Sequence, residues 1–198
     1  MAGRSSGGSR RRPGAARPAS GRAVESAAAP AAGLSLEEVT RPRRWEGLEL
    51  RPLTDTADAR PLFEFAAVPW PDQSSVAFAW GAFPADGGPS LAAVVVERAG
   101  RATLLHGPLV VIEGHRHDPI AVATQLLGAV TAHAAALGAD TLFARPQGLD
   151  RMWIRCGFIP VPEAALPAAL AGRPGAGLYG WRGGSALWTL RDAGDAAA

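Results

Sequence analysis

The sequence predicts a mixed α/β fold, in which helices flank a central sheet that is mostly antiparallel. Two observations support this prediction. Three β-prone runs follow one another across short, turn-forming spacers, which is typical of antiparallel hairpins. The clearest helical pattern of the chain comes after these runs, and short strands and helices alternate from there to the C-terminal end.

The N-terminal half of the fold begins with a strand over 48–53, where apolar and polar residues alternate. A short helix over 60–67 follows, and Pro61 suits its first turn. The three β-prone runs then span 76–83, 91–98 and 102–112. Gly107 and Pro108 interrupt the last run, so we expect a bulge or a bend there.

The most regular helix is predicted over 119–137. Asp118 is a good N-cap, Pro119 fills the first helical position, and Gly138 is placed to end the helix. Its apolar residues recur at steps of three and four, at Ile120, Ala123, Leu127, Val130 and Ala134. The remaining predicted elements are a strand over 140–145, a helix over 148–156, and strands over 158–161 and 185–190. The segment 162–184, rich in Pro, Gly and Ala, is left unassigned.

Charge divides the chain into a basic tail and a mildly acidic domain. The 198 residues carry a formal net charge of +2, but residues 1–35 hold six arginines and one acid, while the rest hold 14 arginines and 17 acids. The tail 1–35 has no aromatic residue and no periodic apolar face, so we expect it to be disordered. Its Arg10–Arg12 run is compatible with an anionic partner, yet an idle solvated tail is the preferred interpretation, and nucleic acid is not expected as a partner.

Composition excludes several kinds of chemistry. The chain has no lysine, which rules out a Schiff-base lysine and a P-loop lysine. The single Cys156 rules out an intrachain disulfide and a four-cysteine zinc site. His115 and His117 lack a third ligand nearby, so no metal is expected. No stretch reaches the roughly 20 apolar residues of a membrane span, and we expect a cytoplasmic protein without membrane contact.

Two stretches resemble the GNAT superfamily of acyl-CoA-dependent N-acyltransferases, over roughly residues 46–190. The family joins a strand to its long helix by a loop of pattern Arg/Gln-x-x-Gly-x-Gly/Ala, whose amides hold the pyrophosphate of the cofactor. Here the corresponding stretch is Arg116-His117-Asp118-Pro119-Ile120-Ala121, with proline at the central glycine. The second stretch, 151–161, resembles the family's fourth helix running into Gly-Phe and the next strand.

The resemblance implies a GNAT-like fold over 46–190 and acetyl-CoA or another acyl-CoA as cofactor. It implies that the cofactor is bound by Val111, Arg116, His117, Asp118 and Ala121. Pro119 removes an amide donor, and Asp118 places a negative charge where phosphate is expected, so binding is predicted to be weaker than in a typical member.

The activity implied by the resemblance is transfer of an acyl group to a primary amine, of a small molecule or of a protein N-terminus or lysine. His106 precedes the cofactor loop and is a candidate general base, as is Glu113; a half-buried strand histidine and a solvated carboxylate are the alternatives. Many members carry a tyrosine acid where this chain has Trp153. Because an indole N–H is not a usable acid, a catalytically silent module for ligand sensing or protein interaction is the alternative function. The oligomeric state is left open, with a homodimer among the options.

Overall fold

The computed structural model describes residues 35–112, 117–146, 148–173 and 187–191, and the expected tail lies almost wholly outside them. In these residues eight strands form one sheet of order β1-β2-β3-β4-β5-β6-β8-β7. The strands are β1 (Arg43–Trp45), β2 (Leu48–Pro52), β3 (Val76–Pro84), β4 (Ala92–Ala99), β5 (Ala102–Val110), β6 (Thr141–Ala144), β7 (Ile159–Val161) and β8 (Leu187–Arg191). The helices are α1 (Leu36–Val39), α2 (Arg60–Phe65), α3 (Pro119–Ala136) and α4 (Asp150–Arg155).

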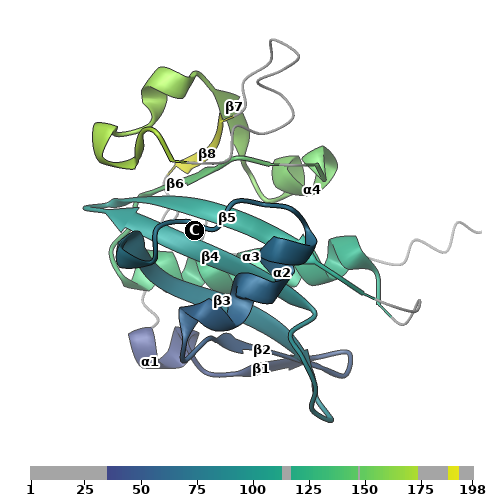
Figure 1. Cartoon of the computed structure of the whole chain (residues 1–198). Coiled ribbons are helices and arrows are strands. Elements are labelled where there is room, and N and C mark those ends of the chain that lie inside the picture. The colour runs from purple at the N-terminus through teal and green to yellow at the C-terminus, as the bar shows by residue number, and fades with distance from the viewer. Residues whose placement is uncertain (1–34, 113–116, 147, 174–186, 192–198) are drawn as a thin grey trace, which may run out of the picture.

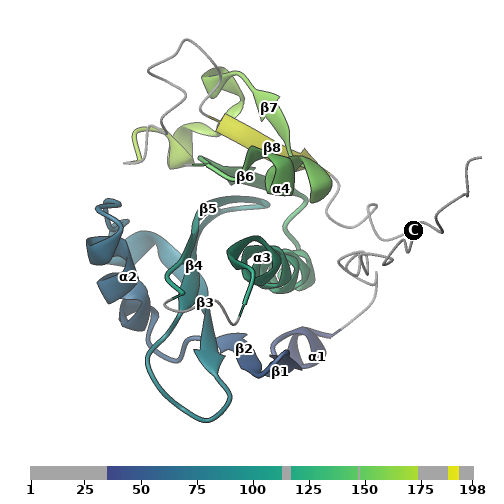
Figure 2. The same ribbon diagram turned by 90° about the vertical axis from the view of Figure 1, so that its right-hand side faces the viewer.

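Neighbouring strands pair antiparallel, except for β5 and β6, which are parallel. The predicted mixed, mostly antiparallel sheet with flanking helices is therefore confirmed. The parallel pair exists because α3 connects the two strands as a crossover. Figure 2 shows α3 on one side of the sheet and α2 on the other.

The long helix α3 begins and ends as its sequence indicates. The Asp118 side chain accepts a hydrogen bond from the Ile120 amide at 3.0 Å, and Gly138 adopts a positive φ of 80° just past the end. By length and hydropathy α3 could cross a membrane. Its buried residues, among them Leu126 and Val130, instead pack in the core that lies against the sheet, as those of a core helix do.

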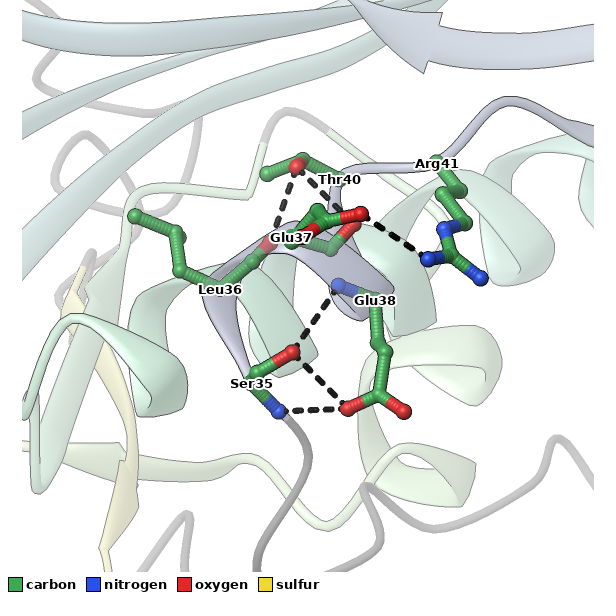
Figure 3. A network of polar contacts seen from close by, with 6 residues as sticks. All are labelled: Ser35, Leu36, Glu37, Glu38, Thr40 and Arg41. Atoms are coloured by element: carbon green, nitrogen blue, oxygen red, sulfur yellow. Dashed lines mark hydrogen bonds and ion pairs between the residues drawn. The ribbon is translucent and has the colours of Figure 1, made fainter.

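Two elements at the start of the domain have no counterpart in the sequence prediction. Helix α1 is a single turn closed by a capping box, in which Glu38 accepts from the Ser35 amide at 2.8 Å and its own amide donates to Ser35 Oγ at 3.3 Å (Figure 3). Strand β1 has three residues and pairs with β2. Both are too short to produce a hydrophobic period, which is why periodicity does not reveal them.

The C-terminal part carries α4 and the strands β6, β7 and β8 at one end of the sheet (Figure 1). The unassigned segment contains two short 3₁₀ turns, Glu163–Ala165 and Ala168–Leu170. Leu166 and Leu170 are buried there, in a small core with Leu104, Phe143 and Leu187. The described part of this segment therefore packs against the sheet beside β6 and β8.

Candidate active site

A cleft opens where β5 runs past the end of β6. The two strands pair only from Ala102 with Thr141 to Leu105 with Ala144, and β5 continues to Val110. The cleft has a volume of about 380 Å³. It is lined by residues of β5, of α2 and the turn after it, of the start of α3, and of the segment from β6 into α4: Phe65, Ala66, Val68, Leu105, His106, Gly107, Pro108, Leu109, Val110, Val111, Pro119, Arg145, Gly148, Leu149 and Trp153.

The expected irregularity in β5 is present and lies in the wall of this cleft. Leu109 pairs with Ala93 and His106 with Val95, so β5 contains one residue more than β4 over this stretch. Gly107 has a φ of 100°, and a Cβ there would lie 2.8 Å from the Ala93 carbonyl oxygen. Only glycine fits this close approach, so the bulge depends on the residue at 107.

The edge of β5 that faces the cleft offers hydrogen-bonding groups to a ligand. From 106 to 110 the strand pairs with β4 on one side and extends beyond β6 on the other. Alternate backbone groups of such a strand point away from its partner. An extended ligand that contains amide groups can pair with this edge as a further strand would.

The predicted cofactor residues lie along the cleft and at the start of α3. Val111 lines the cleft, and its amide donates to the Leu91 carbonyl at 2.8 Å, so it is engaged within the sheet. His117, Asp118 and Ala121 lie at the start of α3, beside Pro119 in the cleft wall. The predicted residues Glu113 and Arg116 lie outside the described residues, as does His115.

The first turn of α3 has few donors left for an anion. Pro119 has no amide hydrogen, and the Ile120 amide donates to the Asp118 carboxylate. The Val122 amide donates to the Asp118 carbonyl, which leaves the Ala121 amide without an acceptor among the described residues. Pro119 and the Ile120 amide are thus not available to a phosphate group at this helix end, while the Ala121 amide is.

His106 belongs to a cluster of ionisable residues, centred on Glu97, that the sequence analysis does not predict. Its Nε2 lies 3.5 Å from Oε1 of Glu97, and Oε2 of the same carboxylate accepts from Nε of Arg173 at 2.6 Å. The Glu97 side chain is completely buried and that of His106 nearly so. Glu97 follows an apolar run in β4. A single carboxylate directly after such a run is the sequence signal that could have indicated this cluster.

The charge state of Glu97 follows from its partners. Burial raises the pKa of its carboxyl, but the neighbouring His106 imidazole and the hydrogen bond from Arg173 outweigh burial and lower the pKa below its ordinary value of 4.5. Glu97 is therefore an ionised carboxylate near neutral pH. An ionised group without water around it needs such partners to be tolerated.

Arg145 is a second charged residue of the cleft that the sequence analysis does not predict. It follows β6, and its guanidinium forms a two-point ion pair with the Glu163 carboxylate, with Nη1 2.9 Å from Oε2. Its side chain is only 9% exposed, whereas that of Glu163 is 58% exposed. The pair joins the start of the 163–165 turn to the cleft wall.

Trp153, at the position where the resemblance implies a tyrosine, is a buried core residue. It is 1% exposed and contacts Phe158 edge to face, with ring centroids 4.8 Å apart. The neighbouring Cys156 packs against the same core, and burial raises the pKa of its thiol. A protonated thiol is a poor nucleophile, so Cys156 is not a candidate for covalent chemistry. The described residues contain no group of three or more potential metal ligands.

Comparison with known proteins gives a likeness in structure alone. No family model matches the sequence, and no curated protein matches it. A GNAT-family acetyltransferase from Staphylococcus aureus is similar with a TM-score of 0.53 at 12% identity, over 73% of this chain and 98% of that one. A Klebsiella pneumoniae protein described as an acyl-CoA N-acyltransferase is similar with a TM-score of 0.52 at 12% identity, over 75% and 99%.

N-acetylglutamate synthase from Neisseria gonorrhoeae, in complex with coenzyme A and N-acetyl-glutamate, is similar with a TM-score of 0.52 at 13% identity. The match covers 76% of this chain and about a third (36%) of that protein. These likenesses, with the sheet order and the α3 crossover, show that the chain has the fold of the GNAT acyltransferases. The GNAT-like fold expected from the sequence is confirmed.

Proposed function

We propose that this protein transfers an acetyl or other acyl group from acyl-CoA to a primary amine. The observation that carries the proposal is the cleft beside β5, where His106 lies next to a strand edge that has no partner strand among the described residues. The acyltransferase fold supports it, and the N-acetylglutamate synthase of that fold holds coenzyme A. The acceptor amine belongs to a small molecule or to a protein N-terminus or lysine, and we place the reaction in the cytoplasm.

The cleft suits one part of acyl-CoA better than the other. Its volume is within the range of small-molecule sites, and its walls are largely apolar, with β5 backbone at one edge. The pantetheine arm is extended and contains two amides, so it matches this edge. At the described start of α3 the diphosphate meets few free amides, among them that of Ala121, beside the negative Asp118. We propose that Arg116 supplies the positive charge needed there and that His117 contributes a ring N–H.

Acyl-CoA supplies the acyl group as an activated thioester. His106 is the proposed general base: it takes the proton that the amine loses as its nitrogen forms a bond to the acyl carbon. The bond from that carbon to sulfur breaks, and the proton passes on to the released thiolate. Glu113 is the second candidate base. Bringing the amine and the acyl carbon together in one cleft removes much of the entropic barrier.

A second function is favoured by Trp153. Because its indole occupies the position of the usual acid and is buried in the core, the chain lacks that proton donor. A protein of this fold that binds an acyl-CoA or an amine without turnover would need no such donor. The alternative is therefore a catalytically silent module for ligand sensing or protein interaction.

Measuring the release of free thiol from acetyl-CoA distinguishes the two functions. The acceptors to be tested are polyamines, amino acids, antibiotic amines and peptides. Acyl transfer predicts amine-dependent thiol release, and the rate of this release should fall roughly a hundredfold in His106→Gln. Asp140→Asn is the matched control, since Asp140 pairs with Arg101 at the opposite end of β5. Saturable binding without thiol release from any acceptor would support the silent module and contradict the transferase.

A further inference from the structure

The cluster of Glu97, His106 and Arg173 joins three separate parts of the chain on the face of the sheet that α2 covers. Val95 packs in the core beneath α2, and Glu97, two residues further along β4, points to the same face. His106 is paired with Val95 in the sheet and so lies diagonally beside Glu97. Arg173 reaches the carboxylate from the segment after the 168–170 turn.

Stability alone does not account for this cluster. Desolvating a carboxylate costs several kcal/mol, and buried ion pairs are often replaced by apolar residues without loss of stability. The neighbours Val94, Val95 and Val96 show that β4 accommodates apolar side chains throughout this stretch. Of the three residues, only His106 lines the cleft. Any effect of the cluster on the cleft therefore passes through the imidazole.

The geometry distinguishes the two ring nitrogens of His106. Neither nitrogen has a hydrogen bond within the described residues, but Nε2 is buried and faces the ionised Glu97 carboxylate at 3.5 Å. A negative oxygen repels a nitrogen lone pair and attracts an N–H, so a neutral imidazole here carries its proton on Nε2. The 3.5 Å separation is longer than an ordinary hydrogen bond, and such contacts often shorten once substrate is bound.

We propose that Glu97 is a positioning residue that holds His106 in the Nε2–H tautomer, with Arg173 fixing the carboxylate, so that Nδ1 is the nitrogen that accepts the proton of the acceptor amine. The role of Nδ1 rests on the proposed function. The tautomer does not, because it follows from the position of Glu97 alone. Arg173 also couples the segment after the 168–170 turn to the site, since its guanidinium and the imidazole hold opposite oxygens of one carboxylate.

The tautomer can be read directly from long-range ¹H–¹⁵N correlations of the histidine rings, recorded on the full chain above the titration range of histidine. The chain has four histidines, and His106→Gln identifies the signals of His106. The expected result is the Nε2–H tautomer in the unmodified protein, with loss of that preference in Glu97→Gln. Glu49→Gln is the matched control, because Glu49 pairs with Arg51 on β2 and should leave the His106 signals unchanged.

A His106 ring in the Nδ1–H form in the unmodified protein would overturn the proposal, and this outcome does not require that Glu97→Gln folds. An unchanged tautomer in folded Glu97→Gln would overturn it as well. In turnover, Glu97→Gln should lower kcat at least about tenfold with little change in KM for acetyl-CoA. If the Nε2–H tautomer is found but no acyl group is transferred to any amine, the proposed function is contradicted, while the positioning role of Glu97 is still supported.

Discussion

The carboxylate of Asp118 accepts a hydrogen bond from the amide of Ile120 at 3.0 Å, across the first turn of α3. The same side chain that starts the helix thus occupies one of its donors and adds a negative charge beside the cleft. Helix capping and anion binding compete for the same amides at this position.

Asp118→Asn should therefore bind coenzyme A more tightly than the unmodified chain. The asparagine keeps the cap but removes the charge. Two negative charges about 4–8 Å apart in water repel by about 0.5–1 kcal/mol, which predicts a roughly twofold to fivefold lower Kd at low salt. Calorimetric titration measures the change, with Asp140→Asn as the control. Equal or weaker binding by Asp118→Asn would show that the Asp118 charge does not oppose the ligand.

Gly107→Ala should destabilise the protein more than Gly100→Ala. Both glycines have a positive φ, but a Cβ at 107 would lie 2.8 Å from the Ala93 oxygen and 2.9 Å from the Leu109 nitrogen, whereas one at 100 meets nothing within 4 Å. The backbone term is about 1 kcal/mol in both variants, and the clash adds to it only at 107. Urea unfolding compares them, and equal losses would mean that the bulge adapts to a side chain.

The stability of the fold should decrease as the pH falls below about 6.5, the ordinary pKa of histidine. His133 is buried between Phe78 and Trp80, and its Nδ1 accepts from the Trp80 indole at 2.9 Å. Burial lowers the pKa of His133 in the folded state, so the unfolded chain takes up the proton first and is favoured in acid.

His133→Gln tests this pH dependence, since a glutamine oxygen can still accept the indole hydrogen bond but does not titrate. The free energy of unfolding, obtained from melting curves at a series of pH values, should depend less steeply on pH in the variant. The difference in slope is at most about 1.4 kcal/mol per pH unit. The same slope in both proteins would place the pH dependence in other groups.

The main elements were predictable because their sequence signals are local. Asp118, Pro119 and Gly138 mark the ends of α3, and the spacers between the β-prone runs predict the hairpins that the sheet contains. Short elements such as α1 escaped prediction, because four residues cannot show a period. The 163–165 and 168–170 turns depend on the burial of Leu166 and Leu170 against other strands, which is a tertiary effect.

The site was predictable only in part. His106 and Val111 stand next to a recognisable motif, and both line the cleft. Glu97 and Arg173 lie 76 residues apart and meet only because β4 and the segment after the 168–170 turn come together in the fold. Arg145 and Glu163 are joined in the same way. No spacing rule connects such pairs, so their role becomes visible only in the structure.

The central claim, that the cleft beside β5 takes the thioester arm of acyl-CoA, is tested most directly by calorimetric titration of acetyl-CoA into the full chain and two tryptophan variants. Ala66 lines the cleft and is exposed, whereas Ala85 is exposed in the turn after β3. Saturable binding should weaken at least about tenfold in Ala66→Trp, equivalent to about 1.4 kcal/mol, and stay unchanged in Ala85→Trp. No saturable binding by the unmodified chain, or equal affinity in all three proteins, would contradict the claim.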